Sequence, residues 1–458
     1  MTPIKGRLKE LYKGITPSLE QNISISKGTE NLSYYISGRY YKQAGVYRYN
    51  PDDFNKYNFR AKGEIKLNNW LSLSNNLDFS AYDYREPMSS IYQNQVLRNI
   101  ADQGFPMAVL RNPDGSLTQH AAFTLGDYET ANSSRKEKEN MLRNTVGLKS
   151  TFLDKRVNIN ADFTYMQRSG KVNTQLYPIT YSNSPGIMET AGNNFLREDQ
   201  KEERYFANNI YGDYRQEWGK HSFKGLLGYN LEYSRTRKNR FQRDGLLNPE
   251  LPDFSLMDGL NYTSTGGGAD WAIFGAFYRL NYIFDNRYLF TGTIRRDGFS
   301  GFGPDNKYSI FPSIAFGWRL TEESFFQNIN RETINDLKLR LSYGLNGNRT
   351  VGRYETLPKM DSSFGNGYLY GDGASAEIGQ YMSSLPNSNL KWETTASFNT
   401  GIDFSLINNR LFGSLDLYWS NTYDLLYNIN IPRINGFSSI ASNIGEMKNS
   451  GQEFTLTG

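Results

Sequence analysis

Residues 291–320, TGTIRRDGFSGFGPDNKYSIFPSIAFGWRL, contain the clearest structural signal in the chain. From Tyr308 to Trp318, every second residue except Pro312 is large and apolar, and most residues between them are small or polar. A period of two places these two sets on opposite faces of a β-strand. Pro312 cannot donate a ladder hydrogen bond, so we expect a bulge or a lost pairing at this position. The stretch predicts two strands around a loop rich in Gly and Asp.

The same alternation recurs along most of the sequence. It is clear in residues 32–42, 57–67, 71–81, 157–165, 337–345 and 392–406. We expect about fifteen strands, most of them about ten residues or longer, whereas strands in soluble proteins have about five or six. A tilted strand needs about 9 to 11 residues to cross a bilayer. The strand length therefore favours membrane-spanning β-structure.

The connections between these segments alternate in length. Short turns are expected near residues 68, 154, 219, 285 and 408, and long polar segments at 83–141, 167–203, 234–270, 347–391 and 424–450. Only the connection at 321–336 is longer than its place predicts. This order is typical of an all-β, antiparallel up-and-down transmembrane barrel with short periplasmic turns and long extracellular loops. A Greek-key sandwich gives no reason for such sorting.

Composition limits the other possibilities. The 458 residues have a mean hydropathy of −0.64, and no run approaches the ~20 apolar residues of a spanning helix. The chain has 0 Cys and 2 His, so most nucleophilic and metal-binding schemes lack a required group. We expect no catalytic residues, no metal and no cofactor. The 51 basic and 47 acidic residues are interspersed, which argues against a nucleic-acid partner.

Six separated blocks resemble the SusC/RagA family of TonB-linked outer-membrane transporters (TonB-dependent receptors). They are LSYYISGRYYKQAGV, KYNFRAKGEIKLNNWLSLSNNL, NRYLFTGTIRRDGFSGFGPDNKYSIFPSIAFGWRLTEESFF, INDLKLRLSYGLNGN, LKWETTASFNTGIDFSLINNRLFGSLDLYWSNTYDLL and INGFSSIASNIGEMKNSGQEFTL. RRDG at 295–298 and NIGE at 443–446 are the most specific parts. The resemblance covers nearly the whole chain from Leu32.

The resemblance implies a barrel of about 22 strands, closed by an N-terminal plug, in the Gram-negative outer membrane. Such a protein imports oligosaccharides or peptides with a SusD-like surface lipoprotein, and TonB–ExbB–ExbD supplies energy through the plug. We expect a partial barrel of about fifteen strands at residues 22–458, an unassigned segment at 1–21, and no plug in this chain. Unpaired edges are costly in hydrocarbon, so we expect a fragment of a longer reading frame.

Charged residues on the polar face are the first candidate site. Arg60, Lys338, Arg340 and Asp403 are expected to face the lumen, because a charge on the lipid side is costly. In a full-length relative they would contact the plug. The alternative is a ladder of mutually neutralising charges that keeps the barrel interior wet.

Aromatic and basic residues near the loops are the second candidate site. Tyr84, Tyr368 and Tyr370 lie in long loops, and sugars stack on aromatic faces. Arg296 lies where a strand leaves the barrel and is a further ligand-binding candidate. For this rim, the alternative is that Arg295 pairs with lumen carboxylates while Asp297 and Gly298 turn the chain.

Two other function classes remain open. A soluble or surface β-rich module could bind glycans through its loops without transporting them. An outer-membrane enzyme ranks third, because no nucleophile, base and orienting group converge in the sequence.

Five Trp residues fall near predicted strand ends, as an aromatic belt at the lipid headgroups requires. They are Trp70, Trp218, Trp271, Trp318 and Trp392.

Overall fold

The computed structural model describes residues 12–93, 109–130, 132–184, 186–326, 330–370 and 375–458, without the side chains of residues 125 and 363–378. Fifteen strands form one antiparallel sheet. In sheet order they are β1 (Ser18–Gly28), β2 (Leu32–Ala44), β3 (Asp53–Lys66), β4 (Leu71–Pro87), β5 (Ser134–Phe152), β6 (Val157–Leu176), β9 (Phe195–Trp218), β10 (His221–Asp244), β11 (Tyr262–Phe284), β12 (Tyr288–Phe299), β13 (Tyr308–Arg319), β14 (Ile334–Asn348), β17 (Glu393–Leu406), β18 (Leu411–Tyr423) and β21 (Glu446–Thr457).

The remaining elements of the described residues lie in the connections between these strands. Three two-stranded hairpins are β7 (Ile179–Ser184) with β8 (Ile187–Ala191), β15 (Lys359–Tyr370) with β16 (Ser375–Ser384), and β19 (Leu426–Asn430) with β20 (Ser439–Asn443). The helical elements are α3 (Gln119–Ala121), η1 (Ala122–Gly126), α4 (Asp127–Thr130), η2 (Phe254–Leu256), η3 (Pro304–Asn306), η4 (Leu320–Glu322), η5 (Ser324–Phe326) and η6 (Arg433–Asn435). No helix in the described ranges is long and apolar enough to cross a membrane.

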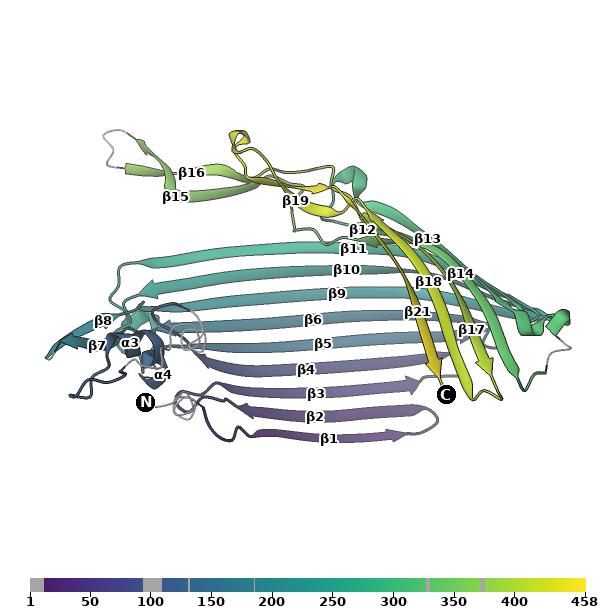
Figure 1. Cartoon of the computed structure of the whole chain (residues 1–458), viewed down its shortest axis with the longest axis horizontal. Coiled ribbons are helices and arrows are strands. Elements are labelled where there is room, and N and C mark those ends of the chain that lie inside the picture. Colours follow the sequence, from purple (N-terminus) through teal and green to yellow (C-terminus); the bar gives the residue numbers. More distant parts are fainter. Residues whose placement is uncertain (1–11, 94–108, 131, 185, 327–329, 371–374) are drawn as a thin grey trace.

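The sheet is an up-and-down meander, as the alternation predicted. Each strand pairs with the strands next to it in the chain once the three hairpins are set aside, and the sheet curves from β1 round to β21 (Figure 1). One set of connections is short, at 29–31, 67–70, 153–156, 219–220, 285–287 and 407–410, and its one long member is 320–333, the exception that the sequence also indicated. The other set is longer and carries the hairpins, at 45–52, 88–133, 177–194, 245–261, 300–307, 349–392 and 424–445. The predicted sorting of loops is confirmed.

Local chemistry explains the tight turns. Asp285 and Asn286 have φ of 54° and 52°, and Asn408 and Asn409 have φ of 54° and 61°. Asp and Asn tolerate this left-handed region, and consecutive residues of positive φ match the twist of a two-strand hairpin. At the turn at 67–70, the Asn68 side-chain oxygen instead accepts hydrogen bonds from the backbone amides of Trp70 and Leu71.

Several strands are much longer than the sequence predicted. β9 and β10 each have 24 residues, so the expected loops at 167–203 and 234–270 are largely strand. Beyond the lipid both faces of a strand meet water, so the apolar alternation used to find strands disappears there. Backbone pairing continues with charged side chains, for example between Arg240 Nε and Asp199 Oδ1, 2.5 Å apart. The first strand begins at Ser18, and the domain boundary at residue 22 stays a prediction.

The two faces of the sheet differ in character. One face carries exposed apolar and aromatic side chains on successive strands: Phe59, Phe79, Leu148, Ile159, Tyr214, Leu227, Tyr278, Ile294, Ile314, Leu341, Phe398 and Leu415. The opposite face carries the polar and charged residues described below. We call these the apolar face and the polar face. An apolar surface that crosses so many strands fits contact with lipid chains.

Pro312 produces a lost pairing and not a bulge. The ladder between β12 and β13 continues through Ile294 and Pro312 without a shift in register. The ladder between β13 and β14 covers Ser313 to Arg319, so it begins directly after the proline. The outer part of β13 therefore separates from β14.

A buried cluster packs where β13 and β14 separate. Its members are Ile273, Phe299, Phe302, Phe311, Leu390 and Trp392. The Trp392 indole lies 5.6 Å from the Phe311 ring and donates to the Lys307 carbonyl at 3.1 Å. Trp392 is only 7% exposed, so its predicted place in a headgroup belt is wrong. Trp70 and Trp218 lie at the tight-turn end of the sheet and are half exposed.

Candidate functional site

Four of the predicted polar-face residues take part in ion pairs. Asp403 on β17 accepts hydrogen bonds from Lys338 Nζ at 3.3 Å and Arg340 Nε at 2.9 Å, both from β14. On β3, Arg60 Nε lies 2.5 Å from Asp78 Oδ1 of β4. Opposite charges thus neutralise each other across neighbouring strands, as the second interpretation of this face describes.

Arg340 also reaches a strand that is not its neighbour. Its guanidinium nitrogen Nη2 lies 2.9 Å from Asp416 Oδ1 on β18, with β17 between the two. Gly401 occupies the intervening position, since it pairs with Arg340 on one side and Asp416 on the other. A Cβ at Gly401 would lie 2.4 Å from Asp416 Oδ1. The absence of a side chain there is what allows the contact.

Arg295 makes a similar contact across an intervening strand, also on the polar face. Its Nη2 donates to Asn230 Oδ1 at 2.7 Å, from β12 to β10, and its Nε donates to Asp297 Oδ1 at 2.7 Å. Gly275 of β11 lies between them, and a Cβ there would meet Arg295 Nη2 at 2.2 Å. Arg295 therefore has a carboxylate partner on the polar face. The expected turn at Asp297 and Gly298 is wrong, because both residues lie within β12.

Arg296 lies on the apolar face, next along the strand from Arg295. It shares the alternation of the exposed Ile294, and its guanidinium stands 4.6 Å from the centre of the Tyr308 ring. Gly298 pairs with Tyr308, and its lack of a side chain leaves room for this ring. The ligand-binding role of Arg296 stays a prediction.

The Tyr candidates lie on the loop side of the sheet. Tyr84 is in β4, not in a loop, and its ring lies 6.2 Å from Phe54 on the polar face. The Tyr84 hydroxyl donates to Glu86 at 3.5 Å. Tyr368 and Tyr370 lie on β15, opposite Glu377 and Ser375 of β16, and their side chains are outside the described part.

The polar face is hollowed beside Arg60. A concavity of about 600 Å³ crosses β1 to β5, and its charged lining consists of Arg39, Lys56, Arg60, Asp78 and Arg143. Cations exceed carboxylates in this lining. Among the described residues, no group of three or more His, Asp or Glu side chains is placed to hold a metal ion.

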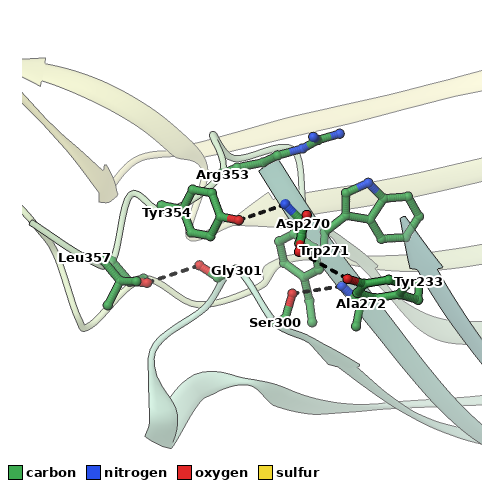
Figure 2. Close-up of a pocket in the computed structure, with 11 residues that line it drawn as sticks. Tyr233, Asp270, Trp271, Ala272, Ser300, Gly301, Arg353, Tyr354 and Leu357 are labelled. Carbon is green, nitrogen blue, oxygen red and sulfur yellow. Dashed lines mark hydrogen bonds between the residues drawn. The ribbon is translucent and has the colours of Figure 1, made fainter. Parts of the chain in front are cut away.

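A second pocket lies where the loop at 349–358 meets β11 (Figure 2). The pocket holds about 260 Å³. The Tyr354 hydroxyl accepts from the Asp270 backbone N–H at 2.7 Å, and the Tyr233 hydroxyl donates to the Asp270 carboxylate at 3.1 Å. Arg353 lines the mouth and donates to the Ala269 carbonyl at 3.3 Å. These contacts fix the loop against the outer part of the sheet.

The loop at 88–133 holds a buried carboxylate. Asp127 at the start of α4 is 4% exposed, and its Oδ2 accepts from the Ser90 backbone N–H at 2.8 Å and from Ser90 Oγ at 3.1 Å. Burial raises the pKa of Asp127 to about 6, because removal from water disfavours the charged form more than these hydrogen bonds favour it. This loop therefore contains a group that titrates just below neutral pH.

Sequence reasoning missed Asn230 and the two glycines that the arginines cross. Gly275 and Gly401 each interrupt an alternating strand, which is a sign of close approach by another group. The sequence did not predict which side chain crosses each glycine, because that depends on the register of three neighbouring strands.

Comparison with known proteins gives concordant results. A family described as TonB dependent receptor-like, beta-barrel, matches residues 10–458. TonB-dependent receptor P26 of Formosa agariphila is 30% identical over 458 residues, 98% of this chain and 44% of that protein. TonB-dependent receptor SusC of Bacteroides thetaiotaomicron is 34% identical over 283 residues, 58% of this chain and 26% of that protein. The chain thus spans less than half the length of these relatives.

Solved structures show the same fold. The RagAB peptide importer in its closed-closed state matches with a TM-score of 0.79 and 24% identity, over 98% of this chain and 49% of that chain. The RagAB peptide transporter matches with a TM-score of 0.75 and 23% identity, over 98% of this chain and 49% of that chain.

Proposed function

We propose that this chain, which belongs to the β-barrel family of TonB-dependent receptors, forms part of the wall of an outer-membrane nutrient importer. Membership places the chain in the outer membrane of a Gram-negative bacterium. The proposed transport is driven by TonB–ExbB–ExbD acting through a plug. The proposed ligand is a glycan or a peptide, captured with a SusD-like surface lipoprotein.

The contrast between the two faces of the sheet carries this proposal. The apolar face suits lipid, and the polar face carries paired charges such as Lys338 with Asp403 on a surface that suits a wet lumen. A surface module that only bound glycans would need no lipid-facing band across its strands. The RagAB structures, described as a peptide transporter and a peptide importer, favour a peptide, and the glycan alternative rests on the resemblance seen in the sequence.

The polar-face charges have a proposed second role beyond mutual pairing. In the concavity lined by Arg39, Arg60 and Arg143, cations exceed carboxylates, so this part of the wall can accept carboxylates of a plug. Arg340 is already shared between two carboxylates and has less capacity for another partner.

Uptake measurements test the proposal. A strain lacking the gene for this chain should lose uptake of labelled oligosaccharides or of labelled peptides, and a restored gene should recover it. A protonophore should abolish the same uptake, because TonB action needs the proton gradient. Surface binding that disappears in the mutant while uptake and growth persist would instead favour the glycan-binding module.

A further inference from the structure

One arginine at the loop-side rim of the polar face lies beside two aromatic rings. Arg349 is the first residue after β14. Its guanidinium carbon lies 5.2 Å from the centre of the Trp271 ring and 4.8 Å from the centre of the Phe299 ring. No described residue accepts a hydrogen bond from this guanidinium or forms an ion pair with it. Arg340, in contrast, already holds two carboxylates.

The two rings are fixed on the polar face. Trp271 of β11 pairs in register with Ser234 of β10. Ser234 shares the alternation of Asn230, whose contact across β11 lies on the polar face. Phe299 is 4% exposed and belongs to the buried cluster against which Trp271 also packs. Because packing holds both rings, the arginine beside them has a rigid support.

Contact with the rings leaves the donors of Arg349 available. A cation–π contact attracts the charge of a guanidinium, but it does not occupy the five N–H donors as a carboxylate does. Burial lowers the pKa of Arg349, and the charge of Glu232 acts in the opposite direction. The Arg349 side chain is partly exposed. An arriving carboxylate is attracted strongly here, because the rings exclude part of the water that would screen the charge.

Glu232 supplies an acceptor on the same face. Its Oε2 accepts from the Tyr205 hydroxyl at 3.0 Å, and its Oε1 accepts from Asn230 Nδ2 at 3.4 Å. The Tyr205 ring lies 6.2 Å from the Trp271 ring, which places this carboxylate beside the arginine. Both partners of Glu232 are neutral, and Glu232 attracts Arg349 without an ion pair. The site therefore offers free donors and a charged acceptor side by side.

We propose that Arg349 and Glu232 bind a ligand group in which a carboxylate stands next to an N–H or O–H donor. The carboxylate accepts paired hydrogen bonds from the planar guanidinium, and the neighbouring donor contacts Glu232. The C-terminal residue of a peptide has this combination, and so does a uronic acid, whose ring hydroxyl stands next to its carboxylate. A neutral sugar lacks it. The inference rests on the proposed function, since it names the chemical class of the imported ligand.

Binding to the purified full chain in detergent, measured by isothermal titration, tests the chemical class. The probes are a short peptide with a free C-terminus, the same peptide amidated, a uronic acid oligosaccharide, and its neutral methyl ester. At least one acid should bind roughly tenfold or more tightly than its neutral form, because the hydrogen bonds to a charged group are lost with the charge. The acid that binds identifies peptide or glycan as the source. Equal affinities within both pairs, or no binding of either acid, would overturn the inference.

Variants of Arg349 test the residue itself. Arg349→Gln should lower the preference for the acid to near one, and Arg349→Lys should keep part of it, because lysine retains the charge without the planar fork. The matched control is Arg410→Gln, at an exposed position in a tight turn at the opposite end of the sheet. It should keep the full preference. A preference for the acid that survives in Arg349→Gln would overturn the site, whereas a general packing defect would weaken both forms equally.

The uptake experiment keeps this inference separate from the proposed function. If deletion of the gene abolishes uptake while Arg349→Gln binds the acid as the unmodified chain does, the function stands and the site is wrong. If the purified chain prefers the acid through Arg349 while deletion leaves uptake intact, the site stands and transport is wrong.

Discussion

The guanidinium of Arg340 lies 2.9 Å from the carboxylate of Asp416, although a complete strand separates their backbones. The contact joins β14, β17 and β18 on the polar face and depends on Gly401 in the middle strand. Arg295, Gly275 and Asn230 repeat the arrangement on β12, β11 and β10. Pairing across three strands ties the curved sheet together by side chains as well as by backbone hydrogen bonds.

Gly401→Ala is expected to destabilise the sheet by about 1–3 kcal/mol, because the new methyl group overlaps Asp416 and Arg340. The measurement is the urea midpoint of the chain in detergent. Gly317→Ala is the control. A Cβ there would meet flexible Lys338 Cε at 3.4 Å and should cost little. Equal midpoints for the two variants would mean that the Arg340 contact contributes nothing to stability.

Trp392→Ala is expected to loosen the loops at 300–307 and 349–392 by about 3–5 kcal/mol of local stability. The indole fills the cluster with Phe302 and Phe311 and binds the Lys307 carbonyl. Limited proteolysis should show faster cleavage in these loops. Trp392→Phe should have a smaller effect, and Trp419→Ala on the apolar face should have none on loop cleavage. Unchanged cleavage in Trp392→Ala would contradict a packing role.

Acidification is expected to stabilise the loop at 88–133. The pKa of Asp127, about 6, lies above its unfolded value of about 3.9. The folded loop therefore holds more protons between these values, and its stability rises as pH falls from above 6 toward 4. The full difference is on the order of 2–3 kcal/mol. Protease protection should thus be greater at pH 5 than at pH 8.

Asp127→Asn should keep that protection at pH 8 and remove most of its pH dependence. The amide oxygen can still accept from Ser90, and the buried charge is gone. If the variant shows the same pH dependence as the unmodified chain, Asp127 does not control it.

Alanine replacement of Tyr368 and Tyr370 together is expected to weaken ligand uptake. Tyr84→Ala is expected to do so separately, through a ring that stands beside Phe54 on the polar face. The measurement is the ligand concentration at half-maximal uptake. Tyr262→Ala, at an exposed strand position, serves as a control. Uptake that does not change would remove these residues from the binding site.

The membrane boundary made most of the fold predictable from sequence. Lipid on one side and water on the other impose a strict alternation, so the strand starting at Leu71 and that starting at Val157 were placed from pattern alone. The sorting of loops followed from the meander. Where β9 and β10 leave the lipid, the same physical constraint ends, and their charged outer parts resembled loops.

The site was predictable only in part. The charges of Lys338 and Asp403 were placed on one face because alternation fixes the face of every residue in a strand. The sequence did not predict the partners of Arg295 or the burial of Trp392. These depend on strand register and on loops that fold back over the sheet.

The order of the strands also bears on how the protein assembles. Every ladder in the large sheet joins segments that are consecutive once the loop hairpins are set aside, so no pairing has to wait for a distant part of the chain. Closing a short loop costs less entropy than closing a long one, and the turns at Asp285 and Asn408 already have the twist of a hairpin. The sheet can therefore grow by adding one hairpin after another to an existing edge.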